Sequence, residues 1–203
     1  LAGLKPINNI VDITNFVRHE LGHPLHTFDA QKVQDGEVHV RSAKKKETII
    51  ALDGEEYELD PSMIVIADSK NPIAIAGVMG GLDSGTTEST TRVIIESATF
   101  DHVSVRKTSR ALNLYSDAQL LFEKGLSSEA TEPALARTVQ LILELAGGKV
   151  ISPILEKRDG DYKPLKFDFI PNKANQLIGV NVPKKQMHDI LHALGFQAKK
   201  KGE

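Results

Sequence analysis

The sequence predicts an α+β fold, in which a mixed or antiparallel sheet packs with helices and a truncated small α/β segment follows. Three observations support this. Apolar residues recur at helical spacing from Ile7 to Leu21. Short strand patterns separated by turn residues fill 38–96, and helical patterns return after Asp101.

The first half begins with a helix followed by strands. We expect the helix to carry Pro6 in its first turn. An Asp53-Gly54 pair between two alternating runs predicts a hairpin. Two continuously apolar runs, at 63–67 and 73–76, predict strands that are buried on both faces. The expected strands are Val38–Val40, Thr48–Ala51, Glu56–Leu59, Met63–Ala67, Ile73–Ala76 and Val93–Ile95.

The second half is mainly helical. Asp101 is a suitable N-cap for a helix through Leu112, and a long helix after Ser128 ends at the glycines 147–148. Beyond a polar stretch, the expected elements are a strand Leu165–Ile170, a short helix Asn172–Ile178 and a helix Val182–Leu194. We therefore divide the chain into a domain at 1–155, a linker at 156–163, and the beginning of another domain at 164–203, too small for its own core.

Composition restricts the class of protein. The chain has 203 residues, a formal net charge of −2 and no cysteine. Disulfides and thiolate metal sites are excluded, and global charge gives no sign of a nucleic-acid partner. No apolar run approaches the ~20 residues that span a bilayer, so we expect no membrane contact. Because the chain begins on Leu1 rather than methionine, we expect it to be a piece of a longer polypeptide.

The segment from Leu21 to Asp29 is the most informative stretch. Gly22 and Pro24 end the helical pattern, and apolar neighbours can anchor a loop that holds His26 at a fixed place. The imidazole could serve catalysis, or it could be an ordinary structural histidine. His23 lies beside a turn, and we expect it to be exposed.

A glycine loop and a carboxylate form the second candidate group. Gly77, Gly80 and Gly81 permit close approach of a ligand, or they form only a tight turn. Their spacing matches no nucleotide-binding fingerprint. Glu96 ends a β-branched run, so its carboxylate is expected at a buried edge. A buried carboxylate needs a partner, which is either functional or an internal Arg or Lys.

Other chemistries have little support in the sequence. His188 and His192 have the i, i+4 spacing of zinc ligands, but a helix dipole explains histidines in a last turn, and no third ligand follows. No Gly-x-Ser-x-Gly elbow is present. We expect no metal.

Several ordered motifs resemble a known family. They are 6–16, 21–29, 76–81, 95–98, 105–109 and 122–125. In this order they closely resemble the B3/B4 editing domain of the bacterial phenylalanyl-tRNA synthetase β subunit, over about residues 1–155. The remainder resembles the start of the B5 domain.

The resemblance implies hydrolysis of the ester in mischarged tyrosyl-tRNA(Phe). An apolar activation pocket rejects the extra hydroxyl of tyrosine only about a hundredfold, whereas a pocket that hydrogen-bonds the hydroxyl discriminates far better. The resemblance assigns catalytic roles to His26, near the ester, and to Glu96, as acceptor of the phenol proton. It assigns Lys5, Asn15, Pro24, Gly80, Ser116 and Ala118 to the substrate pocket.

The sequence departs from the family pattern at two positions, one in the implied pocket and one just before Phe122. Lys5 stands where the family usually has arginine, which keeps the charge but loses the planar fork. Leu121 also replaces a usual arginine, which removes a cation that could pair with Glu123 or contact RNA.

For the whole enzyme, the resemblance implies a cytoplasmic phenylalanine–tRNA ligase that uses ATP and Mg, with no cofactor in this fragment. The implied partners are the acceptor end of tRNA(Phe), tyrosine as the aminoacyl group, and an α subunit in an α2β2 assembly. Two alternatives stay open. One is a non-catalytic structural or tRNA-binding module, and the other is a free-standing editing enzyme or unrelated hydrolase.

Overall fold

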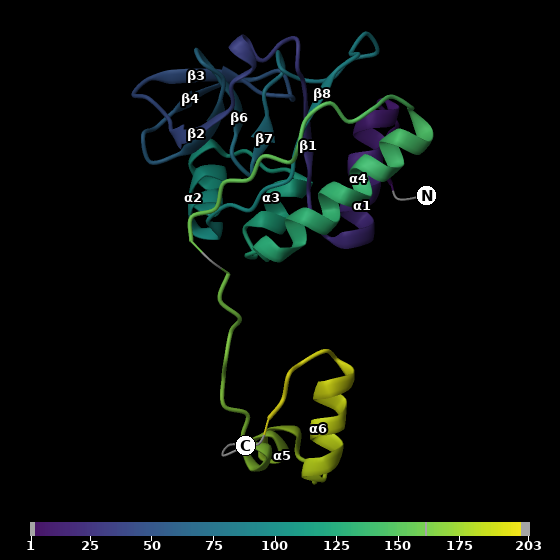
Figure 1. Cartoon of the computed structure of the whole chain (residues 1–203). Coiled ribbons are helices and arrows are strands. Elements are labelled where there is room, and N and C mark those ends of the chain that lie inside the picture. Colours follow the sequence, from purple (N-terminus) through teal and green to yellow (C-terminus); the bar gives the residue numbers. More distant parts are fainter. Residues whose placement is uncertain (1–2, 161, 200–203) are drawn as a thin grey trace. The chain divides into compact units, whose positions relative to one another are not determined.

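A computed structural model describes residues 3–160 and 162–199 (Figure 1). Residues 1, 2, 161 and 200–203 belong to the predicted first domain, linker and last domain, and lie outside the described residues. The chain divides into two compact units, Leu1–Asp159 and Gly160–Glu203. The α+β class is confirmed, since antiparallel strands and helices make up the first unit.

Helices and strands of the first unit follow the predicted order closely. The helices are α1 (Asn9–Leu21), η1 (Gln34–Gly36), α2 (His102–Leu112), α3 (Asp117–Phe122), η2 (Ser128–Ala130) and α4 (Thr131–Leu145). The strands are β1 (His26–Asp29), β2 (His39–Ser42), β3 (Glu47–Ile50), β4 (Glu56–Leu59), β5 (Ile64–Ala67), β6 (Pro72–Ile75), β7 (Met79–Gly80) and β8 (Val93–Glu96).

The strands of the described residues form three antiparallel sheets. A four-stranded sheet has the order β2-β5-β6-β7, β3 pairs with β4 as the predicted hairpin, and β1 pairs with β8. β5 and β6 are largely buried, as their continuous apolar runs predicted. The pairing of β1 with β8 joins segments that lie far apart in the sequence.

Local capping explains where α1 and α2 begin and end. The side chain of Asn8 accepts a hydrogen bond from the Val11 amide, so α1 starts after Pro6, and the prediction that Pro6 lies in its first turn is wrong. Gly22 adopts a left-handed conformation with φ of 70° and ends the helix. Asp101 caps α2 as predicted, accepting from the Ser104 amide.

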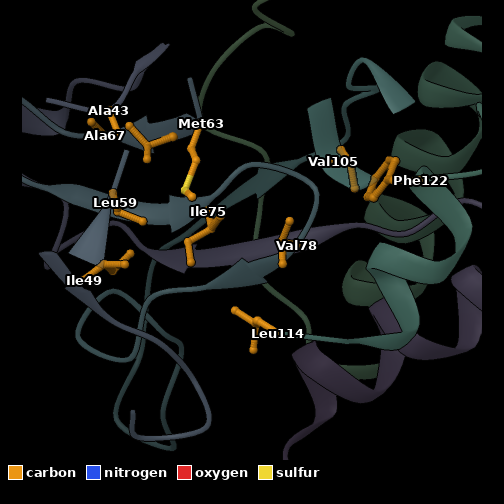
Figure 2. Close-up of a cluster of buried hydrophobic side chains, with 11 residues drawn as sticks. Ala43, Ile49, Leu59, Met63, Ala67, Ile75, Val78, Val105, Leu114 and Phe122 are labelled. Atoms are coloured by element: carbon orange, nitrogen blue, oxygen red, sulfur yellow. The ribbon is translucent and has the colours of Figure 1, made fainter. Parts of the chain in front are cut away.

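Among the described residues, three clusters of buried hydrophobic side chains hold the first unit together, one of them formed by Phe28, Val33, Ile66, Ile73, Ala74 and Ala76. The main hydrophobic cluster fills the space between the sheets and the helices α2 and α3 (Figure 2). It contains Ala43, Ile49, Leu59, Met63, Val65, Ala67, Ile75, Val78, Val105, Leu114 and Phe122. A separate cluster of Ile13, Val17 and Ala134 packs α1 against α4, which lie side by side in Figure 1.

The second unit contains helices α5 (Pro171–Ile178) and α6 (Lys184–Ala193), close to the two predicted helices. The predicted strand Leu165–Ile170 is wrong, because the structure assigns no strand between residues 162 and 199. A strand needs a paired neighbour, and this apolar segment has none among the described residues of its unit. Leu165 is 92% exposed. In neither unit is a described helix long and apolar enough to cross a membrane.

Candidate active site

The β1–β8 pairing brings the two predicted catalytic residues together. His26 and Glu96 are directly opposite partners in this antiparallel pair. Opposite partners place their side chains on the same face of a sheet. His26 therefore lies on a strand, and the prediction that it lies on a loop is wrong. The strand forms because its hydrogen-bonding partner, β8, lies 64 to 70 positions further along the chain.

Both side chains line a pocket with about 400 Å³ of empty space, part of it open to solvent. Strands, the turn before β7 and helix α3 all contribute to its walls. The lining residues are Pro24, Leu25, His26, Ile66, Ala74, Ile75, Gly77, Val78, Met79, Gly80, Glu96, Phe100, Ala118 and Phe122. The lining is therefore apolar and aromatic except for one imidazole and one carboxyl group, a pattern typical of ligand sites.

The His26 ring is fixed by its neighbours. It packs edge-on against Phe28, with 4.6 Å between ring centroids and 74° between planes. A β-carbon on Gly80 would lie 2.4 Å from His26 Cε1, so the glycine leaves room for the ring. The Nε2 atom is buried without a hydrogen-bond partner among the described residues. Burial lowers the pKa of His26 to about 4, which keeps the imidazole neutral at pH 7.

Glu96 lies in the same apolar surroundings. Burial raises its pKa to about 7. Within the described part of the chain, no Arg or Lys forms an ion pair with this carboxyl group, and no side chain hydrogen-bonds to it. The internal cation that the sequence left open is therefore not found there. A buried carboxyl group of this kind is a candidate for a functional role.

Two of the three glycines serve packing. Gly77 adopts φ of +68°, and a β-carbon there would lie 2.8 Å from Phe100 and 2.9 Å from Val105. A β-carbon on Gly81 would lie 2.7 Å from the Ile73 carbonyl oxygen. The glycine loop is thus a tight turn that also forms one wall of the pocket.

The other predicted pocket residues separate into two groups. Pro24 and Ala118 line the pocket. Ser116 lies behind it, where its hydroxyl donates to the Val78 carbonyl at 2.5 Å and accepts from the Gln119 amide at 3.0 Å, capping α3. Lys5 is exposed and Asn15 is half-buried, and neither is among the lining residues.

The structure shows which groups contact Glu123 when residue 121 is leucine and not arginine. Leu121 is half-buried on α3, and Glu123 accepts a hydrogen bond from Gln119 Nε2 at 2.9 Å and lies 3.4 Å from Lys124 Nζ. Glu123 therefore has partners even though residue 121 is not an arginine.

The aromatic wall of the pocket could not be predicted from the sequence. Phe100 and Phe122 pack edge-on at 5.2 Å, and both line the pocket. Phe122 belongs to the 122–125 motif, but nothing in its spacing indicated contact with Phe100. The expectation that His23 is exposed is wrong, because its side chain is completely buried beside Phe122.

The two histidines of α6 lie side by side, and no third ligand joins them among the described residues. His188 and His192 stack with their centroids 6.4 Å apart. Residues 3–160 and 162–199 contain no group of three His, Asp or Glu side chains arranged to hold a metal ion.

Comparison with known proteins supplies the family. A model described as the B3/4 domain matches residues 1–147. The chain belongs to the B3/4 domain family. Phenylalanine–tRNA ligase β subunits are similar to it over nearly its whole length, with 43% identity over 201 residues in Moorella thermoacetica and 45% over 202 residues in Staphylococcus haemolyticus. This chain spans about a quarter of the length of those relatives, 25% of each, and its B3/4 domain contains the whole pocket.

Proposed function

We propose that the B3/4 domain hydrolyses the ester bond of tyrosyl-tRNA(Phe), as the editing site of a phenylalanine–tRNA ligase. The observation that carries the proposal is the juxtaposition of His26 and Glu96 across β1 and β8, in a pocket whose other walls are apolar and aromatic. The similarity of this chain to phenylalanine–tRNA ligase β subunits supports the proposal.

Glu96 is proposed to select the substrate. The tyrosyl ring would lie among Phe100, Phe122 and Ala118, and its phenol would donate a hydrogen bond to the Glu96 carboxylate. Phenylalanine would leave that buried carboxylate without a partner, and an unpaired buried polar group is costly. Sites that hydrogen-bond a substrate hydroxyl reject the analogue without it by up to about 10⁴–10⁵.

His26 is proposed to position the groups that react at the ester bond of the aminoacyl-tRNA. Its neutral ring offers the unpaired Nε2 to a water or to a terminal ribose hydroxyl. Attack of that water on the ester carbonyl would form a tetrahedral intermediate, and the ribose oxygen would leave with a proton. Positioning of this kind needs neither a covalent nucleophile nor a metal.

Deacylation of tyrosyl-tRNA(Phe) and phenylalanyl-tRNA(Phe) by the full-length synthetase tests the proposal. We expect Glu96→Ala to abolish the preference for the tyrosyl ester, and His26→Ala to slow hydrolysis by about 10²-fold or more with a smaller effect on preference. Glu58→Ala, on the exposed face of β4, is the matched control and keeps both rate and preference. A preference that survives Glu96→Ala contradicts the role of Glu96. A wild-type enzyme that hydrolyses neither ester indicates a non-catalytic module instead.

The proposal extends to the whole protein. We propose the acceptor end of tRNA(Phe) as substrate carrier, an α subunit as partner because the relatives are β subunits, and ATP and Mg as ligands of the complete ligase. We also propose that residues 156–163 link the B3/4 domain to the start of a B5-like domain at 164–203. No cofactor is assigned to the B3/4 domain.

A further inference from the structure

His23 is a buried titratable group that the proposed mechanism does not use. It lies between Gly22, which ends α1, and the pocket residue Pro24, and its exposure is 0%. Neither ring nitrogen has a partner at hydrogen-bonding geometry among the described residues. Burial lowers its pKa, while the nearby backbone of Ala98 raises the pKa by less. An imidazole buried this completely requires an explanation, because an apolar side chain would fill the space without the cost.

The ring of His23 contacts the aromatic wall of the pocket from behind. It packs edge-on against Phe122, with 6.1 Å between centroids and 84° between planes. Phe122 in turn packs against Phe100 at 5.2 Å. Because both phenylalanines line the pocket, His23 supports a wall that the substrate ring would touch.

The other side of His23 faces the segment that leaves β8. Ala98, whose backbone acts on the ring, stands between Glu96 and Phe100 in the chain. A ring N–H of His23 would donate to the Ala98 carbonyl, which follows Glu96 by two residues in the chain.

The same region of α3 is attached to α1 at a second point. Arg18 Nη1 lies 3.0 Å from the Asp117 carboxylate at the start of α3. Five positions later on both segments, His23 meets Phe122 at the end of α3. The exit of α1 therefore contacts α3 at its two ends, and His23 is the contact closest to the pocket.

We propose that His23 is a positioning residue of the editing pocket, which holds Phe122 on one side and the Ala98 segment on the other and so sets where Glu96 meets the substrate phenol. This inference rests on the proposed function. It requires the N–H of the ring, so a side chain of similar size without a donor should not replace it.

Two substitutions in the full-length synthetase distinguish a positioning role of His23 from a role in filling space. His23→Leu keeps bulk but loses the donor, and we expect it to lower the ratio of kcat/KM for tyrosyl over phenylalanyl ester about tenfold. His23→Gln retains an N–H donor and should restore most of that ratio. A folded His23→Leu enzyme with the wild-type ratio overturns the proposal, because the ring would then only fill space.

A ¹⁵N NMR spectrum of the wild-type 203-residue chain provides a test that does not depend on the stability of the variants. We expect the His23 ring to have a pKa below the usual histidine range and to stay in one tautomer, with a ring N–H protected from exchange. A freely exchanging ring that titrates near pH 6.5 overturns the proposal. A wild-type synthetase with no preference for the tyrosyl ester contradicts the proposed function instead, and it leaves the spectrum to decide the role of His23.

Discussion

The pKa values of His26 and Glu96 are shifted from their ordinary values in opposite directions. Burial raises the pKa of Glu96 to about 7 and lowers the pKa of His26 to about 4. Near pH 5.5, an unfolded chain would carry a charged histidine and a charged glutamate. The folded chain holds the same number of protons on this pair but moves one from the imidazole to the carboxyl group. The pocket thus holds two neutral groups where an ion pair would form in water.

The first prediction concerns the pH dependence of stability at Glu96. Its folded pKa lies above the unfolded value of 4.5, so its contribution is fully present below about pH 4.5 and is lost as pH rises to about 7. Glu96→Gln cannot ionise. The free energy of unfolding of Glu96→Gln should therefore increase relative to that of the wild type between pH 4.5 and 7, by at most about 3.5 kcal/mol at ~1.4 kcal/mol per pKa unit. Above pH 7 the difference between the two proteins should stay constant.

Denaturant unfolding of the 203-residue chain at several pH values measures this difference. His26 contributes in the opposite sense, since its stabilising effect is present above about pH 6.5 and is lost as pH falls through about 4. It is unchanged in Glu96→Gln and therefore cancels in the comparison. A difference between the two curves that is constant with pH contradicts the assignment of a raised pKa to Glu96.

Single residues were predictable where local chemistry decides them. Asp101 caps α2 because a carboxylate before a helix accepts an amide hydrogen bond, and that signal is contained in a few neighbouring residues. His23 was not predictable in this way. A polar residue between Gly22 and Pro24 resembles an exposed turn, and its burial depends on α3, which arrives about a hundred residues later.

At the scale of elements, the strands with their own alternating or apolar pattern were predictable, and β1 was not. The segment His26–Asp29 follows Pro24 by two residues and has no repeated alternation, so the local pattern indicated a loop. It becomes a strand because β8 supplies its hydrogen bonds. The converse holds at Leu165–Ile170, where an alternating pattern lacks a partner strand among the described residues. Strand formation depends on pairing as well as on pattern.

The second prediction concerns the close approach of β7 to β1. Gly80→Ala would place a β-carbon 2.4 Å from Cε1 and 2.7 Å from Nε2 of His26, so the imidazole must move. A displacement of about 1 Å at a reacting centre costs about 10²-fold in rate. We expect deacylation of the tyrosyl ester to fall by about that factor, measured under single-turnover conditions.

Gly85→Ala is the matched control for this change. A β-carbon at Gly85 would lie 3.4 Å or more from its neighbours, and the backbone there is outside the left-handed region. It should leave the rate within about twofold of the wild type. If Gly80→Ala and Gly85→Ala have the same rate, the contact between Gly80 and His26 does not position the ring.

At the scale of the whole chain, the hydrophobic clusters of the described residues all belong to the first unit. The three clusters of buried hydrophobic residues all lie between Ile13 and Ala134. In the described part of the second unit, Met187 alone is a buried hydrophobic side chain. Because burial of apolar area is the main favourable term in folding, the two units should differ strongly in their ability to fold alone.

The third prediction follows from that distribution of the core. A chain that ends at Asp159 should keep the cooperative thermal unfolding of the 203-residue chain, with a midpoint within about 3 °C, since it keeps every cluster and the complete pocket. The separate segment 160–203 should show no cooperative transition, because it buries too little apolar surface to offset the entropy of ordering its chain. Circular dichroism at 222 nm and calorimetry on the three chains provide the measurement. A truncated first unit that melts without cooperativity would show that its core is incomplete without the residues after Asp159.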